Sequence, residues 1–536
     1  MYLSMVTYKI AMKNLFLLFL IPIQFVSYNV FSQSTFETTI GGSGEEVSSK
    51  SIYSNGKIYT AGHTTSIGSG SYDIVFTRLD GNGNLIGSTI AGLAGEDISL
   101  SAAVTNKNEF ILTGYTNSLG MEKPFAMKYD SLGNVIWSKY YNVPGWGEDI
   151  ATLPNGDFYF TGYVSTLDYN VLLTKCDSSG NVIWAKAIGD LNINEGRKIT
   201  VTEDEGALVT GITQVQAGGP SDLFVIKTDK NGNVEWSKKY ATSDFFNWDL
   251  GYAIQVTSSE IIVGCLSYNQ AFNSSPNSPD GLIIRLNPNG SIIKAIAFGS
   301  SEYEDIRDLE IMNDGRICFT GATNYNTNGQ TDVLFAITDT AGNLITQRTF
   351  GGNSYDHGLS IKSISNNDFL IGGYSESLGN GASDMYIIRT DTSGTGSCNS
   401  ISGNIASAFI QITDTLVFDT MSISVTGSIA NFIITNQALP QIIHCSTTES
   451  SEIETEVYIS AFPNPFTTKT VIHMEEINSQ TQFFLYDILG NEIMLANMIE
   501  RRAGEFLLDG NALSDGMYFC VIRNNNSQNF IKLIKQ

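Results

Sequence analysis

The sequence predicts an all-β protein built on a seven-bladed β-propeller. A glycine follows the second apolar run in seven successive copies of one pattern, at Gly62, Gly114, Gly162, Gly211, Gly264, Gly321 and Gly373. The copies recur about every 50 residues and each holds four short apolar runs, which is what a propeller blade requires. No copy contains a 3.6-residue apolar period long enough for a helix, which excludes helical repeats.

Each copy carries the signal of a tight turn after its third run. The turn begins with Asp in six copies and with Asn in one, and a Gly follows three positions later, as in Asp80 to Gly83 and Asn287 to Gly290. The Asp or Asn side chain can accept hydrogen bonds from the turn backbone, and Gly supplies the positive φ that closes a hairpin. The runs after these turns, such as VIWSKYY from Val135, are therefore predicted to be fourth strands.

The seventh copy lacks its fourth strand. After Gly394 the chain continues as TGSCNS, whereas TFETTIGG at residues 35–42 matches LITQRTFGG at residues 344–352. Pairing this N-terminal strand with the last blade would remove two open sheet edges. We therefore expect a ring closed by its first strand.

Composition narrows the function classes. Charged residues make up 16% of the 536 residues, Gly is abundant at 51, and the formal net charge is -24. Binding of nucleic acid or of an anionic membrane surface requires dense Lys and Arg, so this charge disfavours both. Cations, basic partners and neutral sugars remain compatible with it.

The chain divides into five parts. Residues 1–32 resemble a secretory signal peptide, with Lys9 and Lys13 before the apolar run LFLLFLIPIQFV. Residues 33–397 are the expected propeller, residues 398–445 a small β segment, residues 446–456 an acidic linker, and residues 457–536 a second all-β domain. No other segment is apolar and long enough for a membrane-spanning helix, so we expect no transmembrane anchor.

Six cysteines occur in the chain. Cys398 and Cys445 bracket the small β segment, and in an exported protein such a pair suggests a disulfide across it. Cys176, Cys265 and Cys318 fall inside apolar runs and are predicted to be buried free thiols.

The C-terminal domain carries motifs in a recognisable order: FPNP at residues 462–465, LYDILGNEI at 485–493, LSDGMY at 513–518 and the closing IKLIKQ. They resemble the C-terminal sorting domain of type IX secretion substrates. The resemblance implies an immunoglobulin-like sandwich, export to the medium or the outer cell surface, and partners in the secretion machinery and a sortase-like peptidase. The motif positions that carry it are Pro463, Asn464, Pro465, Asp487, Gly490, Gly516 and Tyr518. The propeller also looks like tandem-repeat propellers of secreted bacterial proteins, which concerns its fold and not its function.

Aromatic residues in irregular loops are the candidate ligand-binding residues, because a binding site should differ between blades. Together with one neighbouring acid they are Trp146, Phe245, Phe246, Trp248, Asp249, Tyr268, Phe272 and Tyr303. Exposed rings beside Asn and Asp are typical of sugar or peptide recognition. The alternative is that these rings fold back over the edges of the blades.

Acidic residues recur where each copy begins its first strand: Glu46, Glu96, Asp97, Glu148, Asp149, Glu195, Asp249, Glu304, Asp305 and Asp356. They could ring the channel mouth as a cation site. Because the feature recurs in every blade, we favour the alternative that they cap backbone amides.

The sequence offers little for catalysis or cofactors. The Asp-rich turns resemble calcium loops only loosely, since they lack the later bidentate acid. We therefore expect no cofactor, with calcium at one of these turns as the alternative. Four histidines without metal spacing, and the absence of a nucleophile elbow or phosphate loop, leave no catalytic residues and no metal ligands to assign.

The sequence therefore predicts a secreted or cell-surface propeller that binds a polysaccharide or protein. Two alternatives remain open: an extracellular glycan-degrading enzyme, and a structural or adhesion protein without a small ligand.

Overall fold

The computed structural model describes two compact units. The first covers residues 35–447 except 166–168, 216–218, 243–247, 270, 273–277, 366, 395–399 and 416–417, and the second covers residues 459–536 except 475–481, 488–491, 494–497, 503–504 and 524–527. The predicted signal peptide and most of the predicted linker lie outside these residues.

The first unit is a propeller of seven five-stranded antiparallel sheets. We number the blades by their innermost strands, so that blade 1 begins with β2 and blade 7 with β26. The innermost strands are β2 (Glu46–Ser54), β6 (Asp97–Val104), β10 (Gly145–Thr152), β14 (Ile193–Val201), β18 (Asp249–Val256), β22 (Glu304–Ile311) and β26 (Asp356–Ser365). Each contacts its neighbour, and β26 contacts β2, so the ring is closed.

Three further strands continue each blade outward. The second strands are β3 (Lys57–Thr64), β7 (Phe110–Thr116), β11 (Phe158–Ser165), β15 (Ala207–Gln214), β19 (Ile261–Ser267), β23 (Ile317–Thr323) and β27 (Asp368–Ser375). The third strands are β4 (Asp73–Leu79), β8 (Lys123–Tyr129), β12 (Tyr169–Cys176), β16 (Ser221–Thr228), β20 (Asp280–Leu286), β24 (Asp332–Thr338) and β28 (Asp384–Asp391). The fourth strands are β5 (Leu85–Gly92), β9 (Val135–Tyr141), β13 (Val182–Gly189), β17 (Val234–Thr242), β21 (Ile292–Gly299), β25 (Leu344–Phe350) and β1 (Thr35–Ile40).

The N-terminal strand closes the ring as the sequence predicts. β1 is the fourth strand of blade 7 and pairs antiparallel with β28, with Phe36 opposite Arg389 and Ile40 opposite Met385. Phe36 and Ile40 are fully buried. The Tyr386 hydroxyl donates a 2.5 Å hydrogen bond to the buried Glu37 carboxylate. Blade 7 is therefore built from both ends of the propeller segment.

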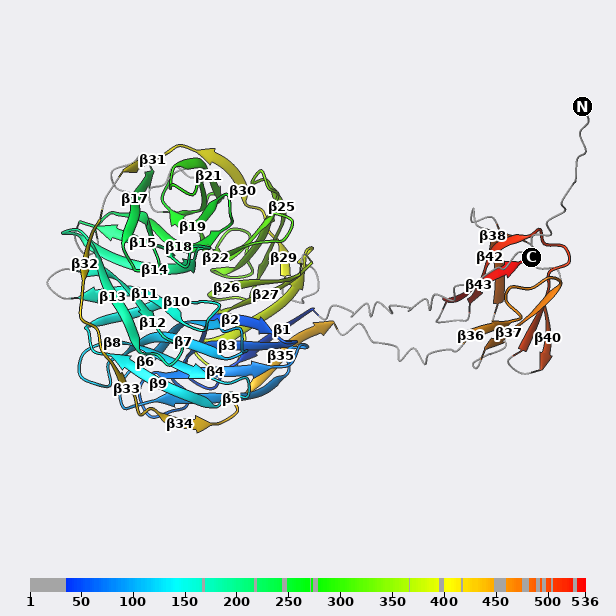
Figure 1. Ribbon diagram of the computed structural model, residues 1–536, viewed down its shortest axis with the longest axis horizontal. Coiled ribbons are helices and arrows are strands. Elements are labelled where there is room, and N and C mark those ends of the chain that lie inside the picture. Colours follow the sequence, from blue (N-terminus) through cyan, green and yellow to red (C-terminus); the bar gives the residue numbers. More distant parts are fainter. Residues whose placement is uncertain are drawn as a thin grey trace, which may run out of the picture. The chain divides into compact units, whose positions relative to one another are not determined.

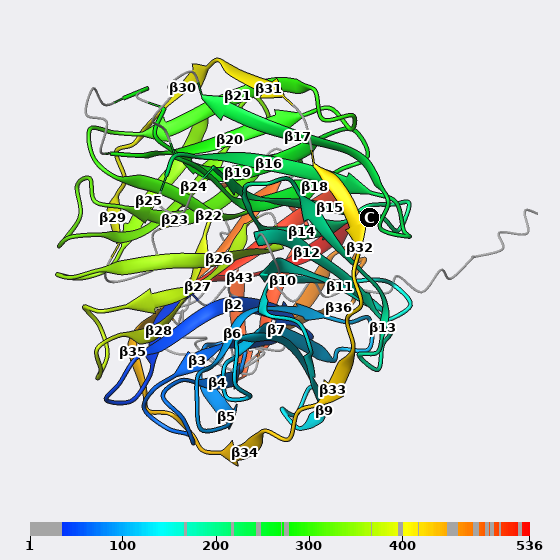
Figure 2. The ribbon, with the colours of Figure 1, turned by 90° about the vertical axis from the view of Figure 1, so that its left-hand side faces the viewer.

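Residues 400–447 form a belt around the outside of the propeller. After blade 7 the chain turns back and adds one outer strand to each blade in reverse order (Figures 1 and 2, yellow and gold). These strands are β29 (Ser400–Ser402), β30 (Ala406–Ile410), β31 (Ile412–Thr415), β32 (Asp419–Ser422), β33 (Gly427–Ile429), β34 (Ile433–Asn436) and β35 (Gln441–Thr447). The segment that the sequence sets apart from the propeller thus belongs to it, because its hydrogen-bond partners are the open outer edges of the blades.

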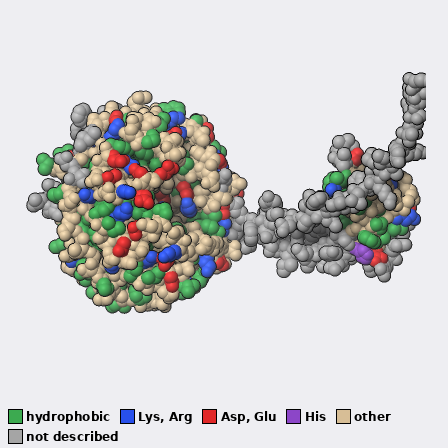
Figure 3. Space-filling view, viewed as in Figure 1, with side chains coloured by type: hydrophobic (Ala, Val, Ile, Leu, Met, Phe, Trp, Pro, Cys, Tyr) green, Lys and Arg blue, Asp and Glu red, His purple; other side chains and the backbone are tan. Residues whose placement is uncertain are grey.

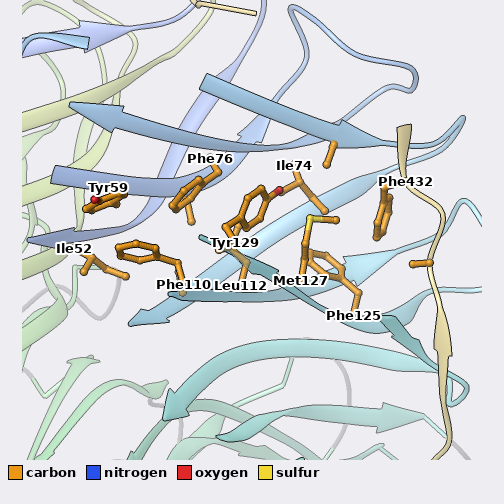
Figure 4. Packing of buried hydrophobic residues seen from close by; sticks show 14 residues of the cluster. Ile52, Tyr59, Ile74, Phe76, Phe110, Leu112, Phe125, Met127, Tyr129 and Phe432 are labelled. Atoms are coloured by element: carbon orange, nitrogen blue, oxygen red, sulfur yellow. The ribbon is translucent and has the colours of Figure 1, made fainter. Parts of the chain in front are cut away.

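Apolar cores fill the spaces between neighbouring blades. In one of them Tyr59 and Phe76 of blade 1 pack against Phe110 and Tyr129 of blade 2, with Phe432 of the belt at the outer end (Figure 4). Inner strands covered on both faces can be apolar throughout, which explains their continuous hydrophobic runs. Cys176, Cys265 and Cys318 are buried free thiols in these cores, as predicted.

The turns before the fourth strands have the predicted chemistry. In blade 1 the Asp80 carboxylate accepts hydrogen bonds from the backbone N–H groups of Asn82 and Asn84 at 2.9 Å and from the Asn84 side chain at 2.9 Å. Gly83 has a φ of 86°. A Cβ on Gly232, in the equivalent turn of blade 4, would lie 2.7 Å from the Trp184 ring of blade 3, so the turn also provides a packing surface for its neighbour.

The second unit is a sandwich of two four-stranded sheets. One sheet contains β36 (Ile459–Phe462), β37 (Lys469–Met474), β41 (Glu505–Asp509) and β40 (Met498–Arg502), and the other β39 (Glu492–Ile493), β38 (Gln482–Asp487), β42 (Gly516–Arg523) and β43 (Gln528–Lys535). Their inner faces share a core that includes Ile472, Phe506, Leu485 and Leu533.

Candidate ligand-binding site at the mouth of the channel

Every innermost strand contains a β-bulge at the same place, beside the repeated glycine of the second strand. A bulge leaves one residue unpaired and re-aims its side chain. The bulged residues are Ser49, Leu100, Glu148, Arg197, Tyr252, Arg307 and Leu359, all half-buried. Because the innermost strands have no inner neighbour, we place these seven residues around the central channel.

The bulged residues differ strongly from blade to blade. Blades 3 to 6 contribute Glu148, Arg197, Tyr252 and Arg307, whereas the other three blades contribute Ser or Leu. The Arg307 guanidinium lies over the Tyr252 ring, 4.1 Å from its centroid. Figure 3 shows acidic and basic side chains gathered around a hollow in the middle of one face. One half of the ring is therefore charged and aromatic while the other half is small or apolar.

Asp305 is the centre of a cluster at this mouth. Its fully buried carboxylate contacts Arg307 at 2.5 Å, accepts a hydrogen bond from the Tyr303 hydroxyl at 2.8 Å, and lies 3.1 Å from His357 Nε2 of blade 7. Burial opposes ionisation, but Arg307 and His357 hold the pKa of Asp305 well below its usual value. The cluster joins blades 6 and 7 through side chains of both.

Glu148 and Arg197 form the second charged group of the ring. Arg197 makes a 2.7 Å ion pair with Glu195, two residues earlier on the same strand. Burial raises the pKa of Glu148, with the charge of Arg197 acting in the opposite direction. The mouth thus holds one carboxyl group with a raised pKa, Glu148, and one with a lowered pKa, Asp305.

Deeper in the channel a further polar layer connects the blades. Lys50 of blade 1 and Asp308 of blade 6 are 2.7 Å apart, although blade 7 lies between those two blades in the ring. Asp149 accepts hydrogen bonds from the Ser101 hydroxyl at 2.5 Å and from the backbone N–H of Ile199 at 2.9 Å. These bonds link the inner strands below the mouth.

An aromatic row leads outward from the mouth along blade 3. We give this name to Tyr115 of blade 2 and to Trp146, Tyr163 and Tyr169 of blade 3. The rings of Tyr115 and Trp146 are stacked at 4.1 Å between centroids and 7° between planes. Trp146 then contacts Tyr163 at 5.5 Å, and Tyr163 contacts Tyr169 at 5.4 Å. Tyr169, at the outer end, is 42% exposed.

Glu122 fixes two rings of this row. The Trp146 indole N–H donates to its carboxylate at 2.7 Å, and the Tyr163 hydroxyl donates at 3.3 Å. Trp146 lies two residues before the bulged Glu148 on β10. The row therefore joins the surface of blade 3 to the charged half of the mouth.

The sequence-predicted site residues separate into distinct environments. Trp146 belongs to the aromatic row, and Tyr303 to the Asp305 cluster. Trp248 is 36% exposed, Tyr268 is half-buried, and Phe272 packs on the core between blades 4 and 5. Phe245 and Phe246 lie outside the described residues. The expected aromatic patch on blades 4 and 5 thus stays a prediction, with Phe272 folded back onto the protein.

Asp249, another predicted site residue, is a buried structural carboxylate. It accepts hydrogen bonds from the Ser267 hydroxyl at 2.5 Å and from the Thr242 backbone N–H at 3.2 Å. Glu46, Asp97, Glu304 and Asp356 similarly accept a hydrogen bond from the backbone N–H four residues earlier. The favoured interpretation, that the recurring acids cap backbone amides, describes these five and also Asp149 and Asp305, since the fully buried Asp305 carboxylate accepts a hydrogen bond from the Ala322 backbone N–H at 2.7 Å. Glu148 and Glu195 are half-buried and line the mouth.

Sequence reasoning missed Arg197, Tyr252, Arg307 and His357. The bulged residue stands at nearly the same place before the repeated glycine of its blade, as Arg197 does before Gly211. Comparing this position between copies would have revealed that it varies while its surroundings repeat.

The predicted disulfide and sorting motif are visible in part. Cys445, on β35, is disulfide-bonded, while Cys398 lies outside the described residues.

Asn464 of the FPNP motif accepts a hydrogen bond from the Ile534 backbone N–H at 2.9 Å and donates one to the Lys532 carbonyl at 2.7 Å. Pro463 and Pro465 flank it, Gly516 begins β42, and Tyr518 donates to the Ser514 carbonyl at 2.7 Å. Asp487 ends β38, and Gly490 lies outside the described residues.

Residues 460–536 match the family model of the secretion system C-terminal sorting domain. The second unit is a sorting domain of this family. It directs the protein through type IX secretion to the cell surface or the medium. Residues 54–85, in blade 1, match a β-propeller domain family of unknown function. In the described part of the chain, no helix has the length and hydropathy that crossing a membrane would require.

The other similarities are distant. An uncharacterized WD repeat-containing protein of Acanthamoeba polyphaga mimivirus is 24% identical over an alignment of 110 residues, and the match covers 16% of this chain and 8% of that protein. A protein of unknown function from Dyadobacter fermentans has a TM-score of 0.38 at 10% identity, covering 67% of this chain and 99% of its own. A polysaccharide lyase has a TM-score of 0.39 at 9% identity, covering 66% of this chain and 91% of its own. A periplasmic gluconolactonase of Pseudomonas aeruginosa has a TM-score of 0.37 at 10% identity, covering 58% of this chain and 95% of its own. At these scores the likenesses carry no functional argument.

Proposed function

We propose that the exported propeller binds a neutral polysaccharide along the aromatic row and into the charged half of the channel mouth. The observation that carries this proposal is the continuous series of ring contacts from exposed Tyr169 to Trp146, which ends beside Glu148. Sugar rings stack their C–H faces on aromatic rings, and a few fixed polar groups then set orientation. Within the row the exposed ring of Tyr169 supplies the first of these features, and the mouth supplies the second.

The rings of the row are held before any ligand arrives. Trp146 stacks on Tyr115 and meets the Tyr163 ring at an angle of 46°, and its indole N–H donates a hydrogen bond to Glu122. A ring that is already fixed loses little side-chain entropy on binding. This preorganisation supports a recognition role for a surface that would otherwise only cover the edge of a blade.

The charges favour an uncharged ligand. Arg197 and Arg307 are each paired with a carboxylate of their own strand, so neither offers a free positive charge at the mouth. The net charge of -24 would repel a polyanion at long range. Carboxylates and guanidinium groups can instead share hydrogen bonds with sugar hydroxyls.

A second candidate function is cleavage of the same glycan. A general acid for such a reaction needs a raised pKa, and burial raises the pKa of the half-buried Glu148 at the mouth. We propose this enzymatic role only as the alternative, with Glu148 as the proton donor. For the sorting unit, we propose removal by a sortase-like peptidase after export.

Binding can be tested with the mature chain and a panel of neutral glucans, xylans and mannans beside acidic alginate and pectin, by isothermal titration calorimetry. Tyr169→Ala should weaken binding of the neutral ligand about fivefold, since loss of one stacking ring costs about 1 kcal/mol. The matched control is Phe409→Ala, which removes a 65% exposed ring from the belt. Equal losses in both variants, or preference for the acidic polymers, would contradict the proposal. Release of shorter sugars from the bound glycan would identify the enzyme instead.

A further inference from the structure

Two sets of aspartates in the propeller have opposite hydrogen-bonding states. The turn aspartates are exposed, and both of their carboxylate oxygens accept hydrogen bonds. Asp339 accepts them from the backbone N–H groups of Ala341 and Asn343 and from the Asn343 side chain, all within 2.9 Å. A second set lies at the junctions between blades, where two carboxyl groups meet around a glycine. In the described residues, several oxygens of this second set are buried without a hydrogen-bond partner.

The junction of blades 6 and 7 shows the arrangement most clearly. Asp332 begins the third strand of blade 6, and Asp356 begins the innermost strand of blade 7. Both are 0% exposed, and Oδ1 of each has no hydrogen-bond partner among the described residues. Oδ1 of Asp332 and Oδ2 of Asp356 each lie 2.5 Å from the point where a Cβ on Gly351 would sit. The two carboxylates therefore face one another across the glycine.

The junction of blades 7 and 1, where β1 closes the ring, repeats this geometry. Asp384 and Glu46 lie 2.0 and 2.6 Å from the position of a Cβ on Gly41. Both acids are buried, and Oδ1 of Asp384 has no hydrogen-bond partner in the described part of the chain. The same pairing of acids around a glycine recurs with Asp280, Gly299 and Glu304 at the junction of blades 5 and 6.

Two other junctions show what takes the place of such a pair. Between blades 3 and 4 the equivalent positions around Gly189 hold Asn170 and Asn194, which are neutral. Between blades 4 and 5 they hold Asp222 and Asp249, and the Lys239 ammonium lies 2.8 Å from Asp222. The junction of blades 3 and 4 thus has two neutral amides in place of the two carboxylates. The junction of blades 4 and 5 keeps the two carboxylates and has the lysine of the protein beside them.

Buried carboxylates with unused oxygens are costly unless a positive charge accompanies them. We propose that the junctions at which two such carboxylates meet, including the two that flank blade 7, each bind a divalent cation of the calcium type between the paired carboxylates. A site made of oxygen ligands selects hard cations. When the protein supplies part of the coordination shell and water completes it, we expect the weak calcium affinity of extracellular modules, with a Kd of about 10⁻⁴–10⁻³ M. Among the described residues no group of three or more acidic, His or Cys side chains is arranged for a metal, so the side chains of the protein would supply at most two ligand groups to each ion.

Such ions would fasten blade 7 to both of its neighbours. Among the described strands, blade 7 alone takes one of its inner four strands, β1, from a distant part of the sequence. An ion at Asp332 and Asp356 would hold it to blade 6, and one at Asp384 and Glu46 would hold it to blade 1. The proposal concerns closure of the ring and is independent of the glycan site.

The test is calcium titration of the metal-stripped full chain by calorimetry, together with thermal unfolding in millimolar CaCl₂ and in EDTA. We expect saturable binding at two or more sites and a melting temperature at least about 2 °C higher with calcium. Asp356→Asn should lower the number of bound ions by one, whereas the turn variant Asp339→Asn should keep it unchanged.

If Asp356→Asn does not fold, Asp384→Asn makes the same test at the other junction. Absence of saturable binding, with equal melting temperatures in calcium and EDTA, would overturn the proposal and indicate a proton shared by each pair. Unchanged stoichiometry in Asp356→Asn would also overturn it, since the ions would then bind elsewhere.

Discussion

Asp249 shows how one buried carboxyl group can set a pH dependence. Burial raises its pKa to about 6, although Ser267 and Thr242 donate hydrogen bonds to its carboxylate. Asp249 stands at the beginning of β18, where the repeat has an acid or an amide. The acids at this position accept hydrogen bonds from backbone N–H groups of the segment that connects two blades. The same residue is one of the candidate ligand-binding residues from the sequence, but its 1% exposure leaves no surface for a ligand.

Replacement of Asp249 by Asn should change the pH profile of stability. The folded state holds its proton more tightly than the unfolded chain does, so the contribution of Asp249 to the free energy of unfolding falls as pH rises from about 4 to about 6. Asp249→Asn removes this titration. Relative to the variant, the wild type should lose on the order of 2 kcal/mol between pH 4 and pH 7, as measured by urea unfolding. Parallel pH profiles for the two proteins would show that Asp249 titrates normally.

At the scale of elements, the belt completes the blade cores as well as the blade edges. Its buried residues recur at the outer ends of successive spaces between blades: Ile405, Phe418, Val425, Phe432 and Leu439. Phe418, for example, meets Phe224 of blade 4 edge-on at 5.0 Å. The belt strands are short, so their stability depends on these anchors.

Removal of one belt anchor should destabilise the whole propeller. Phe418→Ala should lower the free energy of unfolding by roughly 3 kcal/mol, because it creates a cavity between blades 3 and 4. Phe409→Ala should cost less than about 1 kcal/mol, since that ring is largely exposed and contacts mainly the Lys294 ammonium. Chemical denaturation followed by tryptophan fluorescence measures both. If Phe418→Ala lowered the free energy of unfolding as little as Phe409→Ala, the belt would contribute nothing to the cores.

The predicted disulfide would tie the two ends of the belt together. With Cys398 before β29 and Cys445 on β35, the covalent loop would enclose nearly the whole circumference of the propeller. Non-reducing peptide mapping should find this link. Cys445→Ser should lower the free energy of unfolding by about 2–4 kcal/mol in the chain-entropy estimate. A map in which Cys445 pairs with any other cysteine would contradict the prediction.

The repeat explains why the ring was predictable and the belt was not. The period of the glycines, the Asp turns and the orphan strand at Thr35–Ile40 are local signals, and each identifies its own partner. The belt strands carry no such signal, because their partners are blade edges far away along the sequence, as when β35 pairs with β1. The bulges were missed for a different reason: no residue type marks them, and Arg197 and Arg307 are visible only when copies are compared at one position.

At the scale of the whole molecule, the two units have different roles. The sorting unit takes the chain out of the cell, and the propeller presents a ring whose seven blades agree in their backbone but differ in the side chains at the bulge. A cavity of about 350 Å³ also opens between blades 4 and 5 at the opposite end of the innermost strands, lined by residues that include Val201, Val256 and Pro288. Its lining is mixed, because Glu203, Asp204 and the ion-paired Lys227 stand beside the apolar residues, and it lacks the stacked rings of the aromatic row.

Hydrogen–deuterium exchange of the mature chain, with and without a bound neutral glycan, tests the central claim most directly. Contact at the aromatic row and the mouth should slow exchange in residues 145–152 and 158–165 of blade 3 and 193–201 of blade 4, and leave the belt unchanged. Protection confined to the belt, or to the cavity between blades 4 and 5, would contradict it.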